Sequence, residues 1–535
     1  MDLIRMAHRR VNSRNNNGRY KRIVIIAIVA TVIAIPGFTA TTAVPNENPL
    51  DHITASTTAF ALENGMTFIL ISHSHLPAVY CVIYANVGSV DDPKGKTGLA
   101  HLIEHMAFKG TDTIGTKDYM SERRAMDTVD QSLTMLEQER RKGYDADPAR
   151  LRELEKTFHR AQQRADTFVM PDEFINAYRD AGGTNIKATT NSDATIYTAT
   201  VPFESIELWF LLESERFMKP VFRQFYKERS VVLEERRFRI ENQPINLLLE
   251  ELLGATYHAH PYRTPPGGYS DDIQHLTRSD AEEFYRLHYT AQNLVAAVVG
   301  DISLPTFRTL ATKYFGRLPG GRSSPSPMSA EPPQHAVRRA VLDSNGSPIL
   351  LMAYHKPALV DRDWAAFEIL RTLLSDGESS RLQHSLVTEQ KLATGIAVHL
   401  DIPGYKYPGL FIVLAYPAPG IENRRLEEAV RNQLNELCER DVSASELESA
   451  KRRTLTHWLE AIEEPNEIAL TFARFQALTG DYRNFSALMS RLSTVTPGDL
   501  RRVAGMIFTR ANMTVAEIAR HSDNDNKSQI DRNRY

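Results

Sequence analysis

The chain has 535 residues, of which 24% are charged and 42% are hydrophobic, and its formal net charge is −3. These values are those of ordinary globular proteins, and they exclude a disordered chain, a collagen-like chain and a polytopic membrane protein. The near-neutral balance also argues against a nucleic-acid partner, because nucleic-acid binders carry a basic excess. A chain of this length is expected to hold two large domains or about three smaller ones.

The first 43 residues have the order of segments found in a secretory signal peptide. Seven basic residues and one acid lie within positions 1–22, and the apolar run IVIIAIVATVIAIPGF follows at 23–38. The small residues Ala40 and Ala43 then offer cleavage sites. The run is shorter than the roughly 20 residues that span a bilayer comfortably. We therefore predict an exported protein, periplasmic or otherwise extracytoplasmic, whose leader is either cleaved or kept as an anchor through residues 23–38.

The folded part is expected to begin as a β-sheet. Residues 59–71 read AFALENGMTFILI, and an Asn-Gly pair between two apolar runs predicts a β-hairpin. The run at 79–87 is long and apolar enough to predict a strand in the interior of a sheet. A Gly-Lys-Thr-Gly breaker at 95–98 then precedes a predicted helix that starts near Leu99.

Residues 118–170 form a distinct charged block that predicts an antiparallel helical hairpin. Apolar residues recur at heptad spacing along each arm, while ten basic and ten acidic residues balance over 121–170. Between the arms, Asp147 and Pro148 suit the N-cap and the first position of a helix. The hairpin is either a solvated insertion or an element that gates a site or binds a partner.

The remaining chain predicts further strands and helices in two α+β halves. A strand-like stretch reaches Val201, and the segment RLPGGRSSPSPMSAEPPQ at 317–334 is dense in Pro, Gly and Ser, as linkers are. The first half adds helices at 204–218, 227–241 and 277–289 and a buried strand at 294–302. The second half adds strands at 349–357 and 409–418 and helices at 361–375, 378–391, 424–440 and 443–463.

The predicted organisation follows from these boundaries. It comprises a leader or anchor at 1–43, a first domain at 50–318 with the hairpin inserted at 118–170, a linker at 319–335, a second domain at 336–520 and a disordered tail at 521–535. The two cysteines, Cys81 and Cys438, lie in separate halves and are expected to be free, partly buried thiols.

The residues that carry chemistry begin with the pattern H-x-x-E-H inside GLAHLIEHMAFKG at 98–110. On a helix, His101 and His105 lie one turn apart on one face, so two neutral imidazoles can bind one Zn²⁺. Glu104 falls beside that face, where it can take a proton from the attacking water. This is the inverzincin order of the motif. The alternative is a helix with two solvated histidines.

A catalytic zinc site needs a third protein ligand. The segment KERSVVLEER at 227–236 places Glu228 and Glu235 two helical turns apart, so the two carboxylates share a face. One can bind the metal while the other orients a histidine. Taken alone, this segment also fits an ordinary charged helix.

These segments resemble the insulinase/pitrilysin family of zinc metallopeptidases, which includes the mitochondrial processing peptidases. GLAHLIEHMAFKGT at 98–111 is similar to the family signature, and ENGMTFILI, VGSVDDPKGKTGLAHL, ERSVVLEERR, HPYRTP and FYRLHYTAQNLVAAVVGD are similar to family blocks in the same order. The resemblance is strong over about 55–320 and weak over 340–515. It implies two homologous α/β-sandwich halves in a clamshell, and one zinc per chain.

The resemblance also assigns roles to individual residues. It implies that His101, His105 and Glu235 bind the metal and that Glu104 is the general base. It also implies that Glu228 orients a histidine ligand without binding the metal itself. In addition, the stretch GGTNIKATTNSDATIYTATVP at 182–202 is similar to the family strand that pairs with substrate backbone. Lys187 and Ala188 are the predicted substrate-binding positions there, although Lys187 stands where an Asn is usual.

This chain departs from the family pattern in two places. Glu235 follows His105 by 130 residues, farther than is usual, and the hairpin insertion accounts for the excess. In the second half, the Arg-x6-Tyr pair that binds substrate is replaced at the matching positions by Val387 and Thr394. In the split forms of the family one chain carries the metal and a partner carries that pair, and this chain resembles the metal-bearing subunit.

We therefore expect an exported zinc endopeptidase that hydrolyses peptides or unfolded polypeptides. A homodimer, or a heterodimer with a chain that supplies the missing pair, is compatible with the sequence. The alternative is a non-catalytic or partner-dependent peptide-binding subunit of a heteromeric peptidase. The absent Arg/Tyr pair favours that alternative, and the complete ligand set opposes it.

Overall fold

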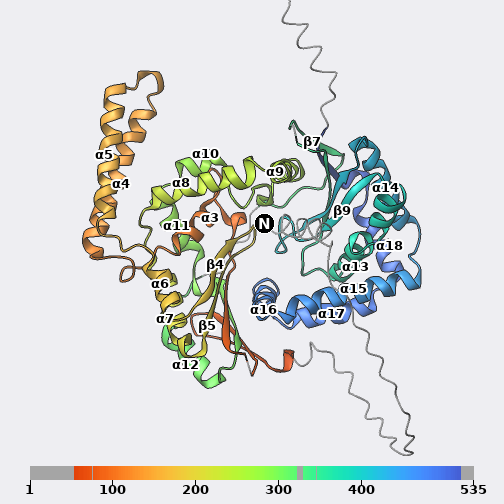
Figure 1. The fold of residues 1–535 in the computed structure, drawn as a ribbon, viewed down its shortest axis with the longest axis horizontal. Helices are drawn as coiled ribbons and strands as arrows, with labels where there is room; N and C mark the ends of the chain where they lie inside the picture. The colour runs from red at the N-terminus through yellow and green to blue at the C-terminus, as the bar shows by residue number, and fades with distance from the viewer. Residues whose placement is uncertain (1–52, 75, 322–328, 345, 520–535) are drawn as a thin grey trace, which may run out of the picture. The chain divides into compact units, whose positions relative to one another are not determined.

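A computed structural model describes residues 53–74, 76–321, 329–344 and 346–519. The predicted leader at 1–43 and the predicted tail at 521–535 lie outside these residues, as does part of the predicted linker. Within the described ranges no helix combines the length and the apolar character needed to cross a membrane. The same residues fall within one compact unit (Figure 1).

The first sheet has six strands in the order β1-β2-β6-β3-β5-β4. The predicted hairpin at 59–71 is present, because β1 and β2 pair antiparallel across a turn in which Gly65 takes a positive φ of 91°. The predicted interior strand is β3, between β5 and β6. The bounds are β1 Thr57–Ala61, β2 Thr67–Ser72, β3 Ala78–Ala85, β4 Thr184–Thr190, β5 Thr195–Pro202 and β6 Leu294–Gly300.

Helices cover one face of this sheet. They are α3 Leu99–Met106, α6 Glu173–Asp180, α7 Ile206–Met218, α8 Phe225–Arg236, α10 Ser270–His275, α11 Arg278–His288 and α12 Leu304–Phe315, whereas α9 (Pro244–Thr256) contacts strands of the second sheet. The predicted helix at 227–241 is α8 followed by a π-helical turn at Arg237–Glu241. Large apolar side chains such as Phe68, Phe210 and Phe307 pack between the sheet and these helices and are fully buried.

The predicted helical hairpin is formed by α4 (Tyr119–Arg140) and α5 (Pro148–Asp166), which lie side by side in Figure 1. As expected, Asp147 caps α5, since its carboxylate accepts the Ala149 N–H at 2.8 Å. The hairpin is tied to the rest of the first half. There Arg278 reaches Asp130 at 2.5 Å, and Asp130 also accepts the Tyr226 hydroxyl at 2.6 Å.

The second sheet has five strands in the order β7-β11-β8-β10-β9. Apart from β1, the two sheets have the same topology. When the five strands of each sheet are numbered along the chain, their spatial order is first, fifth, second, fourth and third, and the first and fifth strands pair in parallel. The strands are β7 Arg338–Leu342, β8 Ile349–Lys356, β9 Ala393–His399, β10 Gly409–Pro417 and β11 Met513–Ile518. The shared topology supports two related halves.

Helices of the second half are α13 Trp364–Ser375, α14 Asn423–Glu439, α15 Ala444–Glu463, α16 Pro465–Thr479, α17 Asn484–Thr494 and α18 Pro497–Ile507. The predicted helix at 378–391 is reduced to a short helical stretch that ends in a π-helical turn at Gln383–Glu389. Sequence patterns identified no element for α16, α17 or α18. The expected α+β fold with two sheet-and-helix halves is confirmed.

The two halves meet in a common hydrophobic cluster, which is separate from the core around Phe68 in the first half. The face of the first sheet that its own helices leave uncovered packs against α16, so Val82 and Val299 join Phe472 in a single buried cluster. A buried carboxylate also links the halves, because Asp193 accepts N–H groups of Tyr405 and Lys406 from the second half. Both free cysteines are partly or fully buried, as expected.

Candidate metal centre

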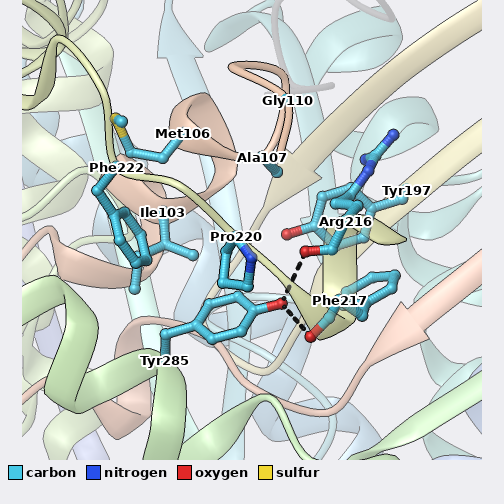
Figure 2. A pocket seen from close by; sticks show the side chains of 10 residues that line it. All are labelled: Ile103, Met106, Ala107, Gly110, Tyr197, Arg216, Phe217, Pro220, Phe222 and Tyr285. Atoms are coloured by element: carbon cyan, nitrogen blue, oxygen red, sulfur yellow. Dashed lines mark hydrogen bonds between the residues drawn. The ribbon is translucent and has the colours of Figure 1, made fainter. Parts of the chain in front are cut away.

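The helix that carries the H-x-x-E-H pattern is fixed at its start and along its apolar face. The Asp92 carboxylate accepts the N–H groups of Gly98 at 2.7 Å and Ala100 at 2.9 Å, where the chain enters α3. Figure 2 shows Ile103 and Met106 of α3 facing Tyr285 and Phe222 around a cavity of about 10 Å³. With this face buried, the opposite face of α3 is left to carry His101, Glu104 and His105.

Two imidazoles and one carboxylate converge beside α3. His105 Nε2 lies 3.2 Å from Glu235 Oε2, and His101 Nε2 lies 3.9 Å from Glu235 Oε1. One possible ligand atom from each of these three residues lies within 4.8 Å of the others, and no other such group occurs among the described residues. Helices α3 and α8 are in contact, which is how residues 130 positions apart in the chain meet.

The donor set fits a zinc ion. Tetrahedral zinc with ligand distances of about 2.0–2.2 Å separates its ligand atoms by about 3.3–3.6 Å. The distances of 3.2 Å and 3.9 Å lie on either side of this range. The carboxylate behind the site also fits, because Glu228 Oε2 lies 3.6 Å from His105 Nδ1 and leaves Nε2 directed at Glu235. Lys109 in turn pairs with the other oxygen of Glu228. His101 Nδ1 is buried and has no hydrogen-bond partner within the described residues.

Without a metal, the three candidate ligands differ in pKa and therefore in charge. Burial, together with the nearby charge of His105, lowers the pKa of His101 to about 4. Burial also opposes a charge on His105, but its bonds to Glu228 and Glu235 outweigh this and raise its pKa to about 9. The bond from His105 is the main reason that the pKa of Glu235 falls to about 2. A metal bound here therefore displaces a proton from His105 at neutral pH.

Glu104 lies on the same helix but outside the group of three possible ligands. Burial raises the pKa of Glu104, while hydrogen bonds with Thr190 of β4 oppose that rise. A carboxylate with a raised pKa accepts a proton more readily at neutral pH, which is what a general base requires.

A cavity of about 420 Å³ opens beside the metal centre. Glu104 and His105 line it together with Phe108 and Ile186, and so do the predicted substrate-binding positions Lys187 and Ala188. Lys187 and Ala188 lie on β4, which ends the strand order of the first sheet, so one edge of β4 faces no other strand of that sheet. Such an edge can pair with an extended peptide. The role of these two residues stays a prediction.

The sequence analysis missed two cations at this centre. Lys109 pairs with Glu228, and Arg239 Nη1 lies 2.7 Å from Glu235 Oε1. Each cation stands in an i+4 relation to a site residue, Lys109 to His105 and Arg239 to Glu235, and that spacing could have indicated them. The second-half positions Val387 and Thr394 differ in environment, since Val387 packs against the core whereas Thr394 is exposed.

The chain is similar in sequence to known peptidases. A family model described as insulinase (peptidase family M16) matches residues 67–139, which include α3, and one described as the peptidase M16 inactive domain matches residues 275–454. The chain is 25% identical over 461 residues to the zinc protease PqqE of Helicobacter pylori, covering 85% of this chain and 90% of that protein.

Solved structures share the fold. A protease from Helicobacter pylori superposes with a TM-score of 0.72 at 24% identity, covering 86% of this chain and 99% of that one. The periplasmic protease PqqL from Escherichia coli gives a TM-score of 0.65 at 17% identity, covering 87% of this chain and 48% of that one. The chain therefore contains two segments that match domains of the peptidase M16 (insulinase) family, and it shares its two-half fold with these solved structures.

Proposed function

We propose that this chain is a zinc-dependent endopeptidase that hydrolyses peptides or unfolded polypeptides. The observation that carries the proposal is the convergence of His101, His105 and Glu235, with Glu104 beside them at the mouth of the 420 Å³ cavity. A relative named a zinc protease supports the choice of metal. The proposed stoichiometry is one zinc per chain.

In the proposed mechanism His101 and His105 would hold zinc through their Nε2 atoms, and Glu235 would hold it through a carboxylate oxygen. Zinc held there would supply Lewis-acid polarisation of the scissile carbonyl and activation of a water molecule. Glu228 orients His105 through its Nδ1 atom and so keeps Nε2 directed toward the ligand position. Glu104 takes the proton of the attacking water on its carboxylate and returns it to the leaving amine.

The proposed substrate is held in an extended form. The free edge of β4 offers main-chain hydrogen bonds at every second residue, so one of the neighbours Lys187 and Ala188 presents its N–H and C=O groups there. Such bonds hold a peptide largely without regard to its sequence. Peptides and unfolded segments adopt an extended form readily, so they are the expected substrates. Export to the periplasm or another extracytoplasmic compartment, through the leader or anchor at 1–43, completes the proposal.

The proposed domain assignment gives the chemistry to the first half. A catalytic domain at 50–318 carries the metal centre, with the hairpin inserted at 118–170, and a linker at 319–335 leads to a second domain at 336–520. No described residue of the second domain belongs to the proposed ligand group. The six-stranded and five-stranded sheets support this division.

The second candidate function is a peptide-binding subunit that needs a partner for turnover. Val387 and Thr394 favour it, because neither side chain can hold a peptide carbonyl as the Arg/Tyr pair of the family does, apart from the short Thr394 hydroxyl. The match of residues 275–454 to the inactive-domain model points the same way. In that case a homodimer, or a heterodimer with a chain that carries the pair, would be the working enzyme.

One experiment separates these functions. The purified full chain is analysed for zinc and incubated with a library of unstructured peptides, with and without a chelator, and mass spectrometry identifies new termini. Chelator-sensitive cleavage by the chain alone supports the endopeptidase. Bound zinc without cleavage supports the partner-dependent subunit. A chain that neither binds zinc nor cleaves refutes both.

A further inference from the structure

A cation lies against the proposed metal ligand Glu235. The guanidinium of Arg239 reaches Glu235 Oε1 at 2.7 Å, and Oε1 is the carboxylate oxygen that faces His101 Nε2 at 3.9 Å. The other oxygen, Oε2, faces His105 Nε2 at 3.2 Å. Arg239 therefore contacts the same carboxylate oxygen that lies nearest to His101, while the other oxygen is left to His105.

The backbone places Arg239 there. Helix α8 ends at Arg236 and continues as a π-helical turn, closed by a bond from the Asn242 N–H to the Arg237 carbonyl at 3.0 Å. A π-helical turn changes the direction of the side chains that follow it, and such turns are frequent at functional sites. The side chain of Arg239 is 47% exposed, so it reaches Glu235 from the solvent side of the centre.

Neighbouring arginines of the same segment do not share this contact. Arg236 is buried and turned away, with Nη2 2.9 Å from both carboxylate oxygens of Glu250, while Arg237 is exposed. Lys109 is the other cation near the ligands, and it pairs with Glu228 behind His105 rather than with a ligand oxygen. Among these four cations only Arg239 contacts a proposed ligand atom.

We propose that Arg239 is a positioning residue that holds Glu235 in place and weakens metal binding at this centre through its charge. The inference rests on the proposed function and adds a control on how tightly its metal is held. A guanidinium on Oε1 neutralises part of the only negative charge among the three ligands. It also lies within a few ångströms of any cation bound between the imidazoles and the carboxylate, where like charges repel. The pair keeps Glu235 oriented in the metal-free chain, and its charge makes metal loading reversible.

The test measures zinc affinity directly in the full-length chain. Apo-protein is titrated with zinc in competition with a chromophoric chelator, for the natural chain and for Arg239→Gln, Arg239→Lys and Arg237→Gln. Arg239→Gln is expected to lower the Kd for zinc at least tenfold. Arg239→Lys keeps the charge and should stay within about threefold of the natural chain. Arg237→Gln removes the same charge from the same segment without touching Glu235, and should leave the Kd unchanged.

The outcomes separate the possible failures. An Arg239→Gln chain that binds zinc equally or more weakly overturns the inference, and so does an equal gain in Arg237→Gln. No measurable zinc binding by the natural chain refutes the proposed function, and the inference falls with it. Circular dichroism monitors the folding of each variant. If Arg239→Gln does not fold, Arg239→Lys still tests the inference. This variant retains the charge, so a tenfold lower Kd for zinc in it would contradict the inference.

Discussion

The two halves arrange their strands in the same topology, yet one pair of equivalent helices differs in character. These are the helix that follows β3 along the chain in the first half and the helix that follows β8 in the second half. In the first half this helix is α3, which buries one face and presents His101, Glu104 and His105 on the other. In the second half it is α13, in which Trp364, Phe367 and Leu370 are fully buried under the packing of α15, α17 and α18. The same topology therefore positions a polar face in one half and fills the equivalent space with core in the other.

The difference teaches that the fold alone does not carry the chemistry. The same α/β fold can form without metal-ligand side chains as long as its helix still covers the sheet. Packing of that helix needs only apolar residues of suitable volume. The first half instead keeps polar groups on the surface of α3, where Glu228 and Glu235 of α8 pair with them. The second half adds α16 to the core of the first sheet, so its contribution is to packing.

The largest expected effect comes from removing the chemistry of the first half. Glu104→Gln keeps the size of the side chain but removes the proton acceptor, so peptide cleavage should fall roughly 10²–10⁴-fold. Zinc content should stay unchanged, because Glu104 is outside the ligand group. Cleavage rates and metal analysis on the same preparation check both parts. Full activity in this variant would contradict the assignment of the base.

Removing a ligand should abolish the metal centre without disturbing the fold. His101→Ala or Glu235→Ala leaves two of three ligands, so bound zinc should drop well below one per chain after dialysis. His384→Ala is the matched control, since His384 is an exposed histidine of the second half and should leave the zinc content unchanged. Metal analysis by mass spectrometry reads out all three variants. Unchanged stoichiometry in His101→Ala would refute the proposed role of that residue.

The same comparison can be made for stability with the two equivalent helices. Leu370→Ala in α13 creates a cavity in a fully buried site and should lower the free energy of unfolding by about 2–5 kcal/mol. His101→Ala in α3 changes the half-buried polar face and should cost much less. Denaturant unfolding of the metal-free proteins measures both. Equal losses in the free energy of unfolding would show that His101 on α3 contributes as much to stability as Leu370 in α13.

A buried lysine of the second half should make stability depend on pH. Burial lowers the pKa of Lys356 to about 7, although Glu368, Asp401 and Asp193 oppose the shift. Unfolded lysine titrates near 10.4, so between about pH 7 and pH 10 the unfolded chain binds the extra proton, and the contribution of Lys356 to stability rises with pH. Lys356→Met lacks this contribution. Its stability advantage over the natural chain should therefore be greatest near pH 7, on the order of a few kcal/mol, and shrink toward pH 10.

Denaturant unfolding at several pH values, performed on both proteins, checks the slope of the difference. Comparing the two chains cancels the titration of other groups, so the difference isolates this lysine. A difference that is independent of pH would contradict the lowered pKa of Lys356.

Local patterns in the sequence determined much of the first half. The Asn-Gly turn, the Asp147 cap and the spacing of His101 and His105 each depend on neighbours within a few residues, so they were predictable without a structure. The H-x-x-E-H face follows from the helical period alone. The prediction that Glu235 completes the site needed more, namely the resemblance to a family, because no local rule joins positions 130 residues apart.

Only the tertiary structure decided which groups surround that site. It brought α8 beside α3, placed Arg239 on the oxygen of Glu235 that faces His101, and packed α16 of the second half onto the first sheet. These contacts depend on how surfaces distant in sequence fit together, and a sequence pattern records only which face of an element is apolar. The sequence by itself therefore determined the kinds of ligand and their order, while packing decided their neighbours and the charge around them.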